Sequence, residues 1–189
     1  FPLIFSTPNF LNTMIPLSMS LIFIFIYLSF NTTNIKSIIS YLAFSQVSII
    51  FYIFCLKEYH AAMFYFITLS LSITMLYLST GYVVSKFNNI SNVKVMGGII
   101  FKMPSMFLFT LIAFLSTSGV PFFSGFYSHE VIISTFYNSE QAILVPSILI
   151  GISASFLISY VFLKNIILIF LGKNKGNIHE FNKINENSS

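Results

Sequence analysis

The sequence predicts an all-α integral membrane protein, a bundle of about five membrane-spanning helices with a discontinuous fourth helix. Of its 189 residues, 56% are hydrophobic and 7% are charged, against about 25% charged in an ordinary soluble domain. One span takes about 20 residues, so the length allows about five spans and leaves no room for a soluble catalytic domain. Glycine and proline in the middle of one apolar segment predict the break in the fourth helix.

Charge and motif content exclude several classes of function. The net charge of +4 lies in the predicted loops and tail, so it indicates membrane topology and not a nucleic-acid-binding surface. Cys55 is the single cysteine, which excludes an internal disulfide and a cysteine metal cluster. The chain contains no GxGxxG, P-loop, HExxH or CxxC motif, and we expect it to contribute no catalytic, cofactor-binding or metal site of its own.

The first half of the chain predicts three spans. An irregular N-terminal segment is expected at 1–13, followed by a span at about 14–30 that ends in a polar turn suited to capping the next helix. The second span, about 38–56, follows Lys36 and contains a stripe of polar residues, for which interhelical hydrogen bonding and a water path are both open. The stripe comprises Ser40, Ser45, Gln46 and Ser48. The third span, about 61–85, is long enough to tilt. Its possible water-path hydroxyls are Thr68, Ser70, Ser72 and Thr74.

The fourth span, about 105–137, carries the predicted functional site. Gly119, Pro121 and Gly125 interrupt it, and His129 and Glu130 follow directly. An ionisable pair beside a broken membrane helix is a functional-site hypothesis by default. The alternative is that the break is a surface loop and the pair its solvated tip.

The fifth span, about 142–171, contains Lys164, which either snorkels to the interface or faces an internal polar path. A polar C-terminal tail is expected at 173–189. Five spans place the termini on opposite faces, and the lysine-rich loops gather on the C-terminal face. The positive-inside rule then puts the C-terminus on the cytoplasmic side or its organellar equivalent.

Several short motifs recur at a characteristic spacing. They are Met96-Gly97-Gly98, Lys102-Met103-Pro104, Gly119-Val120-Pro121 and Gly125-Phe126-Tyr127-Ser128. Over about residues 8–175, the chain resembles the second half of chain 5 of mitochondrial NADH:ubiquinone oxidoreductase, an antiporter-like membrane subunit of respiratory complex I. A chain 2-type subunit and a cation/proton antiporter subunit are the alternatives.

The resemblance implies one antiporter-like repeat of five helices in a split or fragmentary version of that subunit. It implies a multi-pass protein of the mitochondrial inner membrane, with its C-terminus in the matrix. The chain would contribute part of a proton-translocation channel, as a membrane subunit of an H⁺-translocating NADH:ubiquinone reductase. NAD, FMN, iron–sulfur clusters and ubiquinone would bind the rest of the complex, and phospholipid would bind this chain. The implied partners are other membrane subunits, including separate chains that carry the first repeat and a C-terminal lateral helix, and no nucleic acid.

The resemblance also implies a proton path, although two positions depart from the pattern. The path would comprise Lys36, Ser128, His129, Glu130 and Lys164. The family has a lysine–aspartate pair where this chain has His129-Glu130, which moves the unperturbed pKa of the base from about 10.4 to about 6.5. Leu69 and Ile73 occupy the positions of a histidine and a midplane lysine. The alternative is therefore a non-pumping structural subunit of the same complex.

Overall fold

A computed structural model describes residues 8–87, 90–138 and 144–173, and within these ranges the regular structure is helical. The helices are α1 (Pro8–Asn31), α2 (Ile35–Cys55), α3 (Tyr59–Lys86), α4 (Pro104–Thr117), α5 (Ser124–Asn138) and α6 (Leu144–Ile166). A short 3₁₀ turn, Ile99–Phe101, precedes α4, and a π-helical turn, Ile167–Leu171, continues α6.

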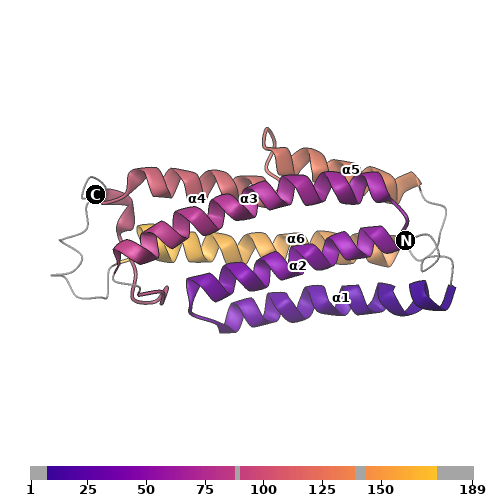
Figure 1. The fold of residues 1–189 in the computed structure, drawn as a ribbon, viewed down its shortest axis with the longest axis horizontal. Coiled ribbons are helices and arrows are strands. Elements are labelled where there is room, and N and C mark those ends of the chain that lie inside the picture. The colour runs from indigo at the N-terminus through magenta and orange to yellow at the C-terminus, as the bar shows by residue number, and fades with distance from the viewer. Residues whose placement is uncertain (1–7, 88–89, 139–143, 174–189) are drawn as a thin grey trace.

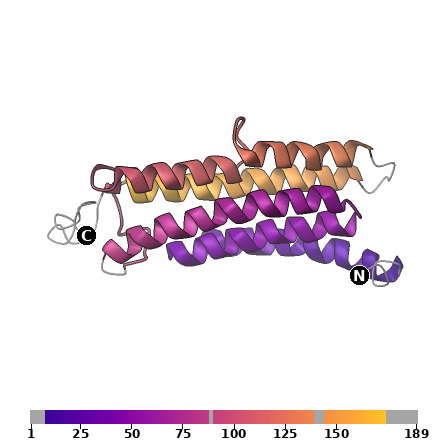
Figure 2. The ribbon, with the colours of Figure 1, turned by 45° about the horizontal axis from the view of Figure 1, so that its top comes forward.

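Five helical columns form the bundle (Figure 1). Helix α2 packs between α1 and α3, and α3 contacts both α4 and α5. Helix α6 contacts α1 and α4, which closes the arrangement (Figure 2). Helix α1 begins and α6 ends at opposite ends of the bundle, as an odd number of crossings requires.

The discontinuous fourth column is confirmed by the lengths of its two halves. Helices α4 and α5 have 14 and 15 residues, or about 21 and 22 Å at 1.5 Å per residue. Neither alone crosses a hydrocarbon core of about 30 Å. They follow one another along the bundle and make one column together (Figure 1). Among the described residues, four other helices are long and apolar enough to span a membrane.

The expectation of an irregular segment over 1–13 is wrong for residues 8–13, because α1 already begins at Pro8. Proline is tolerated in the first helical turn, where the backbone N–H has no helical partner in any case. Residues 1–7, the expected start of the last span at 142 and the tail beyond 173 lie outside the described residues.

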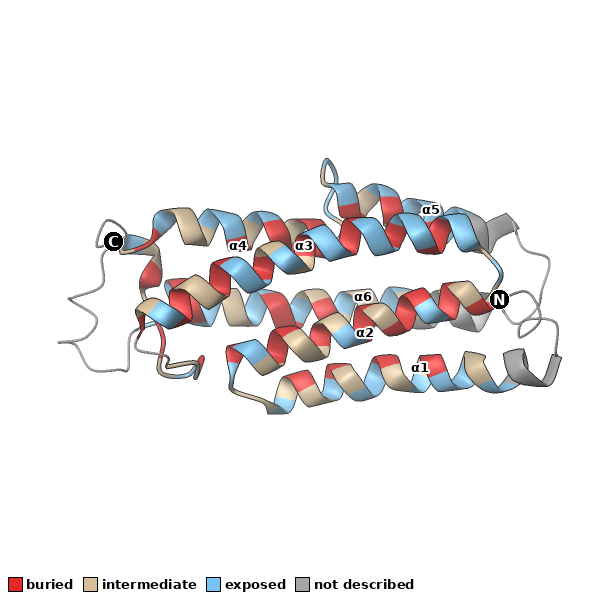
Figure 3. Ribbon diagram, viewed as in Figure 1, coloured by how far each residue is buried: buried red, intermediate tan, exposed pale blue. Residues whose placement is uncertain are grey.

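Buried residues line the inward faces of the helices, and exposed residues cover the outer surface (Figure 3). That outer surface is apolar: the side chains of Leu78, Phe156 and Tyr27 are 74%, 72% and 68% exposed. Helix α2 is the most enclosed of the four long helices: 61% of its apolar membrane-spanning stretch is buried inside the bundle. An apolar exterior around a core that also holds buried serines and threonines is the arrangement expected of a membrane bundle.

A loop connection fixes one end of the bundle. The Asn34 side chain accepts from the Lys36 N–H at 3.1 Å and so caps α2. The loop after α3 pairs with this same turn: the Ile35 N–H donates to the Ser91 carbonyl and the Val93 N–H to the Thr33 carbonyl, both at 2.9 Å. The chain then turns at Gly98, whose φ is +68°, before α4 begins at Pro104.

Candidate functional site at the helix break

The break between α4 and α5 is a tight backbone turn within the bundle. Helix α4 ends at Thr117 and α5 begins at Ser124. In the connecting residues, Gly119 and Phe122 have φ angles of +71° and +76°. Glycine adopts this region at no steric cost, whereas an L residue with a side chain is strained there. The turn is closed by a hydrogen bond from the Val120 N–H to the Leu115 carbonyl at 3.1 Å.

Two glycines allow the segments around the break to approach closely. A Cβ atom at Gly125 would lie 1.7 Å from the Ser116 carbonyl oxygen, far closer than two non-bonded atoms can approach. A Cβ atom at Gly119 would lie 2.9 Å from Cδ2 of His129. Gly125 therefore lets the start of α5 pack on the end of α4, and Gly119 makes room for the His129 ring.

Three serine hydroxyls meet at the break. The Oγ atoms of Ser72 and Ser116 are 2.7 Å apart, and those of Ser116 and Ser124 are 3.1 Å apart. Ser72 lies at the middle of α3, a helix of 28 residues. The break therefore sits near the middle of the membrane thickness that α3 crosses, where an unpaired polar group is most costly.

A second polar contact lies one turn before Ser72 in α3. The Thr68 hydroxyl donates to Oγ of Ser128 at 3.2 Å, and the Ser128 hydroxyl donates to the Gly125 carbonyl at 2.9 Å. Ser128 is fully buried. Thr68 and Ser72 are four residues apart and so share one face of α3, the face that meets α4 and α5.

The His129 ring continues the polar contacts toward the α2–α3 turn. Its centroid lies 5.2 Å from that of Tyr65 in an edge-on arrangement, and the Tyr65 hydroxyl donates to Oε1 of Gln46. The His129 ring also lies beside Gly119, just past the end of α4, where carbonyl groups lose their helical partners. We call the whole set the break network: Gln46, Tyr65, Thr68, Ser72, Ser116, Ser124, Ser128 and His129.

Some of the predicted site residues lie outside this network. Glu130 is exposed, because successive residues on a helix point about 100° apart; in this structure it does not face the ring of His129. Ser70 and Thr74 are exposed on the outer face of α3 and donate to carbonyls of their own helix. Lys36 is exposed in the first turn of α2, and Pro121 is exposed in the break.

Leu69 and Ile73 are part of an apolar stripe on α3. Leu69 is buried, Ile73 packs against the core, and Leu76 continues the stripe one turn on. Beside Leu76 and Phe162 lies a cavity of about 20 Å³, which Thr80, Thr110 and Asn165 also line. That volume holds about one water molecule. At this cavity, the bundle has room for little water between the break network and the lysine-rich end.

At the lysine-rich end, a cavity of about 250 Å³ opens between α1, α6 and the loop after α3. Lys164, Lys94 and Asn165 are among the residues that line it. Asn165 also lines the 20 Å³ cavity beside Leu76. The Lys164 ammonium lies 6.0 Å from the ring centroid of Phe30. Lys164 thus lies at the lysine-rich end of the bundle and outside the break network.

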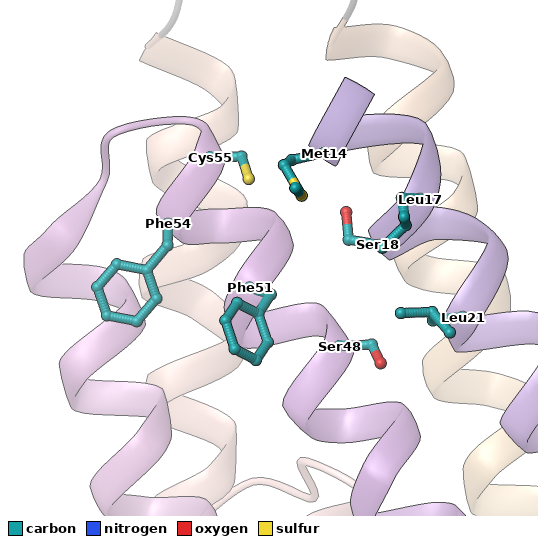
Figure 4. A pocket seen from close by; sticks show the side chains of 8 residues that line it. All are labelled: Met14, Leu17, Ser18, Leu21, Ser48, Phe51, Phe54 and Cys55. Atoms are coloured by element: carbon teal, nitrogen blue, oxygen red, sulfur yellow. The ribbon is translucent and has the colours of Figure 1, made fainter. Parts of the chain in front are cut away.

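A groove of about 440 Å³ between α1 and α2 has a different chemistry (Figure 4). Its lining is apolar apart from Ser18 and Ser48, whose hydroxyls donate to the carbonyls of Ile15 and Phe44 in their own helices. The groove can take hydrocarbon but offers no free polar group for a proton path. Among the described residues, no three His, Cys, Asp or Glu side chains come together to ligate a metal ion.

Four members of the break network were not among the predicted site residues: Gln46, Tyr65, Ser116 and Ser124. A tyrosine among 24 phenylalanines and ten tyrosines gives no signal by type. Its spacing does give one: Tyr65, Thr68 and Ser72 follow the i, i+3, i+7 pattern of one helix face. Ser116 and Ser124 flank the break and could have been found from that position alone.

A multi-helix membrane bundle whose broken helix carries buried polar groups at mid-depth defines a transporter-type membrane protein. The chain belongs to the NADH:quinone oxidoreductase/Mrp antiporter transmembrane family, whose model matches residues 1–159. This result confirms the antiporter-like architecture predicted from the motifs.

Relatives of known name are similar over most of this chain. The chain is 34% identical over 143 residues to NADH-quinone oxidoreductase subunit L of Rickettsia typhi, covering 76% of this chain and 21% of the relative. It is 26% identical over 156 residues to NADH-ubiquinone oxidoreductase chain 5 of Acanthamoeba castellanii, with coverages of 82% and 23%. The same chain of Lycodon semicarinatus is 35% identical over 126 residues, with coverages of 65% and 21%. The predicted resemblance to chain 5 is confirmed, and this chain spans about a fifth of these relatives' length.

Proposed function

We propose that this chain is an antiporter-like membrane subunit of a proton-translocating NADH:quinone oxidoreductase and carries part of its proton path. The observation that carries the proposal is the break network, in which four buried hydroxyls (Thr68, Ser72, Ser116 and Ser128), the exposed Ser124 and one imidazole meet at mid-depth around a broken helix. Family membership supports the same assignment. Redox chemistry belongs to other chains of the assembly, which bind NAD, FMN, iron–sulfur clusters and quinone.

His129 is the group that gains and loses the proton in this proposal. Imidazole can accept a proton on one nitrogen while it donates from the other, and the ring lies between Tyr65 of α3 and Gly119 at the break. Ser128 contacts Thr68, and the hydroxyl of Ser72, one of the three serines at the break, donates to the Thr68 carbonyl. Hydroxyl groups donate and accept at once, so this chain of contacts can pass a proton when water completes it.

The far half of the path must open for a proton to leave. Leu76 and Phe162 close the bundle beside the 20 Å³ cavity, and an apolar gap without water costs several kcal/mol for a charge. Beyond the gap, Asn165 leads to the cavity at Lys164, and Lys36 lies at the same end. The free energy for this opening comes from the rest of the assembly, whose conformational change favours the open arrangement of α3 and α6.

A non-pumping structural role is the second candidate, and one observation favours it. Leu69, Ile73 and Leu76 form a continuous apolar stripe on α3 where the family places a histidine and a lysine. If the stripe never hydrates, the chain seals the membrane arm while other subunits pump.

We also propose the mitochondrial inner membrane as the location, with the lysine-rich end and the C-terminus on the matrix side. The partners are then other membrane subunits, including separate chains that supply the first repeat and the lateral helix. A chain 2-type subunit or a free cation/proton antiporter subunit would differ in its partners. A complex I subunit co-purifies with flavin and iron–sulfur clusters, whereas an antiporter does not.

The test is the proton-to-electron ratio of the native assembly in sealed vesicles, with NADH oxidation and vesicle acidification followed together. His129→Leu removes the proposed proton carrier, and we expect it to lower the ratio while NADH oxidation in uncoupled vesicles persists. Tyr127→Phe is the matched control, because it removes a hydroxyl from the exposed face of the same helix.

An unchanged ratio in His129→Leu, with the assembly intact by native electrophoresis, rules out the proton role and leaves the structural one. An equal fall in both variants points to a general disturbance of α5 and also counts against the proposal.

A further inference from the structure

The outer side of α5 carries a carboxylate at membrane depth. Glu130 lies near the middle of α5 and is exposed. Ser128, two residues earlier, is fully buried. Two residues of an α-helix turn through about 200°, so Glu130 points away from the bundle. It follows Ser124, at the break, by about 9 Å along the helix. Half of a hydrocarbon core measures about 15 Å, so Glu130 lies within the apolar depth of the membrane.

Glu130 has no counter-charge in the part of the chain that the structure describes. No ion pair or hydrogen bond joins its carboxylate to residues 8–87, 90–138 or 144–173. The lysines of the described helices lie in the first turn of α2, at the end of α3 and in the last turn of α6. Charged side chains inside membrane helices are almost always paired or face water. The carboxylate therefore requires a partner that the bundle itself does not supply.

The loop of the break makes a second demand at the same side of the bundle. It projects outward beside the start of α5 (Figures 1 and 2), and the Phe122 side chain is 94% exposed. Among the described residues, neither the N–H nor the carbonyl of Phe122 has a hydrogen-bond partner. Irregular backbone exposed to lipid does not occur within the hydrocarbon region and is tolerated only where protein or a water-filled cavity covers it. This loop therefore also requires a cover.

Apolar side chains surround the carboxylate and the loop. Val120 and Ile133 are 36% and 45% exposed, and Ile133 lies one helical turn after Glu130 on the same side of α5. A surface that is apolar apart from one carboxylate fits a membrane helix that is apolar apart from one cation, because opposite charges attract strongly in a medium of low dielectric constant.

We propose that the break loop and the outer side of α5 form a docking surface for a membrane helix of another chain, and that this helix carries a lysine or arginine level with Glu130. Phe122 packs against the same helix and shields the exposed backbone of the loop. The charge pair selects the partner, since a helix without a cation at that level leaves the carboxylate unpaired. Glu130 then serves in assembly and not in proton transfer at His129.

The competing explanation is that water or lipid covers this side of the bundle. A water-filled space would solvate both the carboxylate and the Phe122 backbone without any partner helix. In that case a neutral side chain at position 130 weakens no contact. The identity of the molecule beside Phe122 and the effect of the charge at Glu130 therefore separate the explanations.

The first experiment uses the native membrane assembly with Phe122 replaced by the photoreactive analogue p-benzoylphenylalanine. Irradiation couples this side chain to the atoms it touches, and the products are mapped by mass spectrometry. We expect an adduct with a membrane helix of another chain that has a lysine or arginine within its apolar stretch. An adduct only with phospholipid, with this chain itself or with a helix that lacks such a cation overturns the proposal, and so does the absence of any adduct.

The second experiment changes the charge. Glu130→Gln removes the counter-charge of the partner's cation, and Glu130→Lys replaces it with a like charge. We expect Glu130→Gln to raise the rate at which the chain leaves the detergent-solubilised assembly about tenfold or more, the usual effect of breaking a buried charge pair. Glu130→Lys should raise the rate further. The rate is followed by native electrophoresis.

Glu58→Gln is the matched control, because it removes a carboxylate at the start of α3, at the end of the bundle. Its rate of release should equal that of the parent. A rate in Glu130→Gln that is unchanged or lower overturns the proposal, and so does an equal rise in Glu130→Gln and Glu58→Gln. None of these outcomes depends on whether the chain conducts protons.

Discussion

At the scale of single residues, the glycines of the break show what sequence reasoning can reach. Gly119, Pro121 and Gly125 predicted a helix interruption because of their backbone properties, and the structure has one there. The sequence could not show that Gly125 meets the Ser116 carbonyl or that Gly119 meets His129. These contacts depend on how α4 and α5 pack, which no local propensity encodes.

The first prediction concerns Gly125. In Gly125→Ala, the new Cβ atom would overlap the Ser116 carbonyl, and the two half-helices must separate. We expect a loss of about 1–3 kcal/mol or more, the usual cost of overpacking, together with loss of the serine contacts at the break. The measurement is the thermal midpoint at which the purified assembly releases this chain.

Gly81→Ala and Gly151→Ala are the controls, because a Cβ atom at either position meets nothing within 4 Å. Both lie in helices, where alanine is preferred over glycine by about 1 kcal/mol, so their midpoints should stay equal or rise. A Gly125→Ala midpoint that matches theirs would contradict the close approach.

At the scale of the helix, α3 shows how the helical repeat of about 3.6 residues decides which hydroxyl groups face the inside of the bundle. Thr68, Ser70, Ser72 and Thr74 alternate along the sequence, and all four were predicted as path residues. A helix turns about 100° per residue, so Thr68 and Ser72 face the bundle while Ser70 and Thr74 face outward. Strict helical spacing could have made this division, and it would also have selected Tyr65.

The second prediction is a coupling between α3 and α4. Ser72 and Ser116 share a buried hydroxyl contact of 2.7 Å. A double-mutant cycle with Ser72→Ala and Ser116→Ala should give a coupling energy of about 0.6 kcal/mol and not above about 1.7, the range for interhelical hydrogen bonds in membranes. The cycle is read from unfolding of the assembly in denaturing detergent.

The matched cycle pairs Ser72→Ala with Ser118→Ala, because the Ser118 hydroxyl donates to a carbonyl of its own helix. That coupling should be near zero. Coupling of the same size in both cycles would mean that the measured energy reports a wider rearrangement of the bundle and not the contact.

The third prediction concerns the apolar closure between the two halves of the bundle. Leu76 is buried beside the 20 Å³ cavity. Leu76→Ser leaves space and adds a hydroxyl, so water can enter beside Thr80 and Thr110. We expect a higher passive proton leak, measured as decay of an imposed pH gradient in vesicles that hold equal amounts of assembly.

Leu78→Ser makes the same chemical change on the outer face of α3, where the side chain is 74% exposed. It should leave the leak unchanged. If Leu76→Ser behaves in the same way, the closure does not lie at Leu76, and the proposed far half of the path needs a different route.

At the scale of the whole molecule, the distribution of charged residues and the number of membrane spans could be predicted from the sequence. Both follow from the free-energy cost of burying a charge in lipid. The five columns and the opposite ends of α1 and α6 match the predicted architecture. One end carries Lys86 at the end of α3 and Lys94 and Lys102 in the segment that follows, whereas Lys57 and Glu58 share the other end. How the columns pack around one another was not readable, since the apolar faces of α1, α2 and α6 resemble one another in composition.

The fourth prediction gives this bundle its direction in the membrane. By the positive-inside rule, the end with Lys86 faces the matrix or cytoplasm. With Cys55→Ala as background, Lys86→Cys and His60→Cys place single thiols near the two ends of α3, whose 28 residues span about 42 Å. A membrane-impermeant maleimide added to sealed inside-out vesicles should label the Lys86→Cys chain, and added to right-side-out vesicles it should label the His60→Cys chain. The reverse pattern would invert the orientation and with it the side on which the proposed path ends at Lys164. Labelling of both positions from one side would contradict the passage of α3 through the membrane.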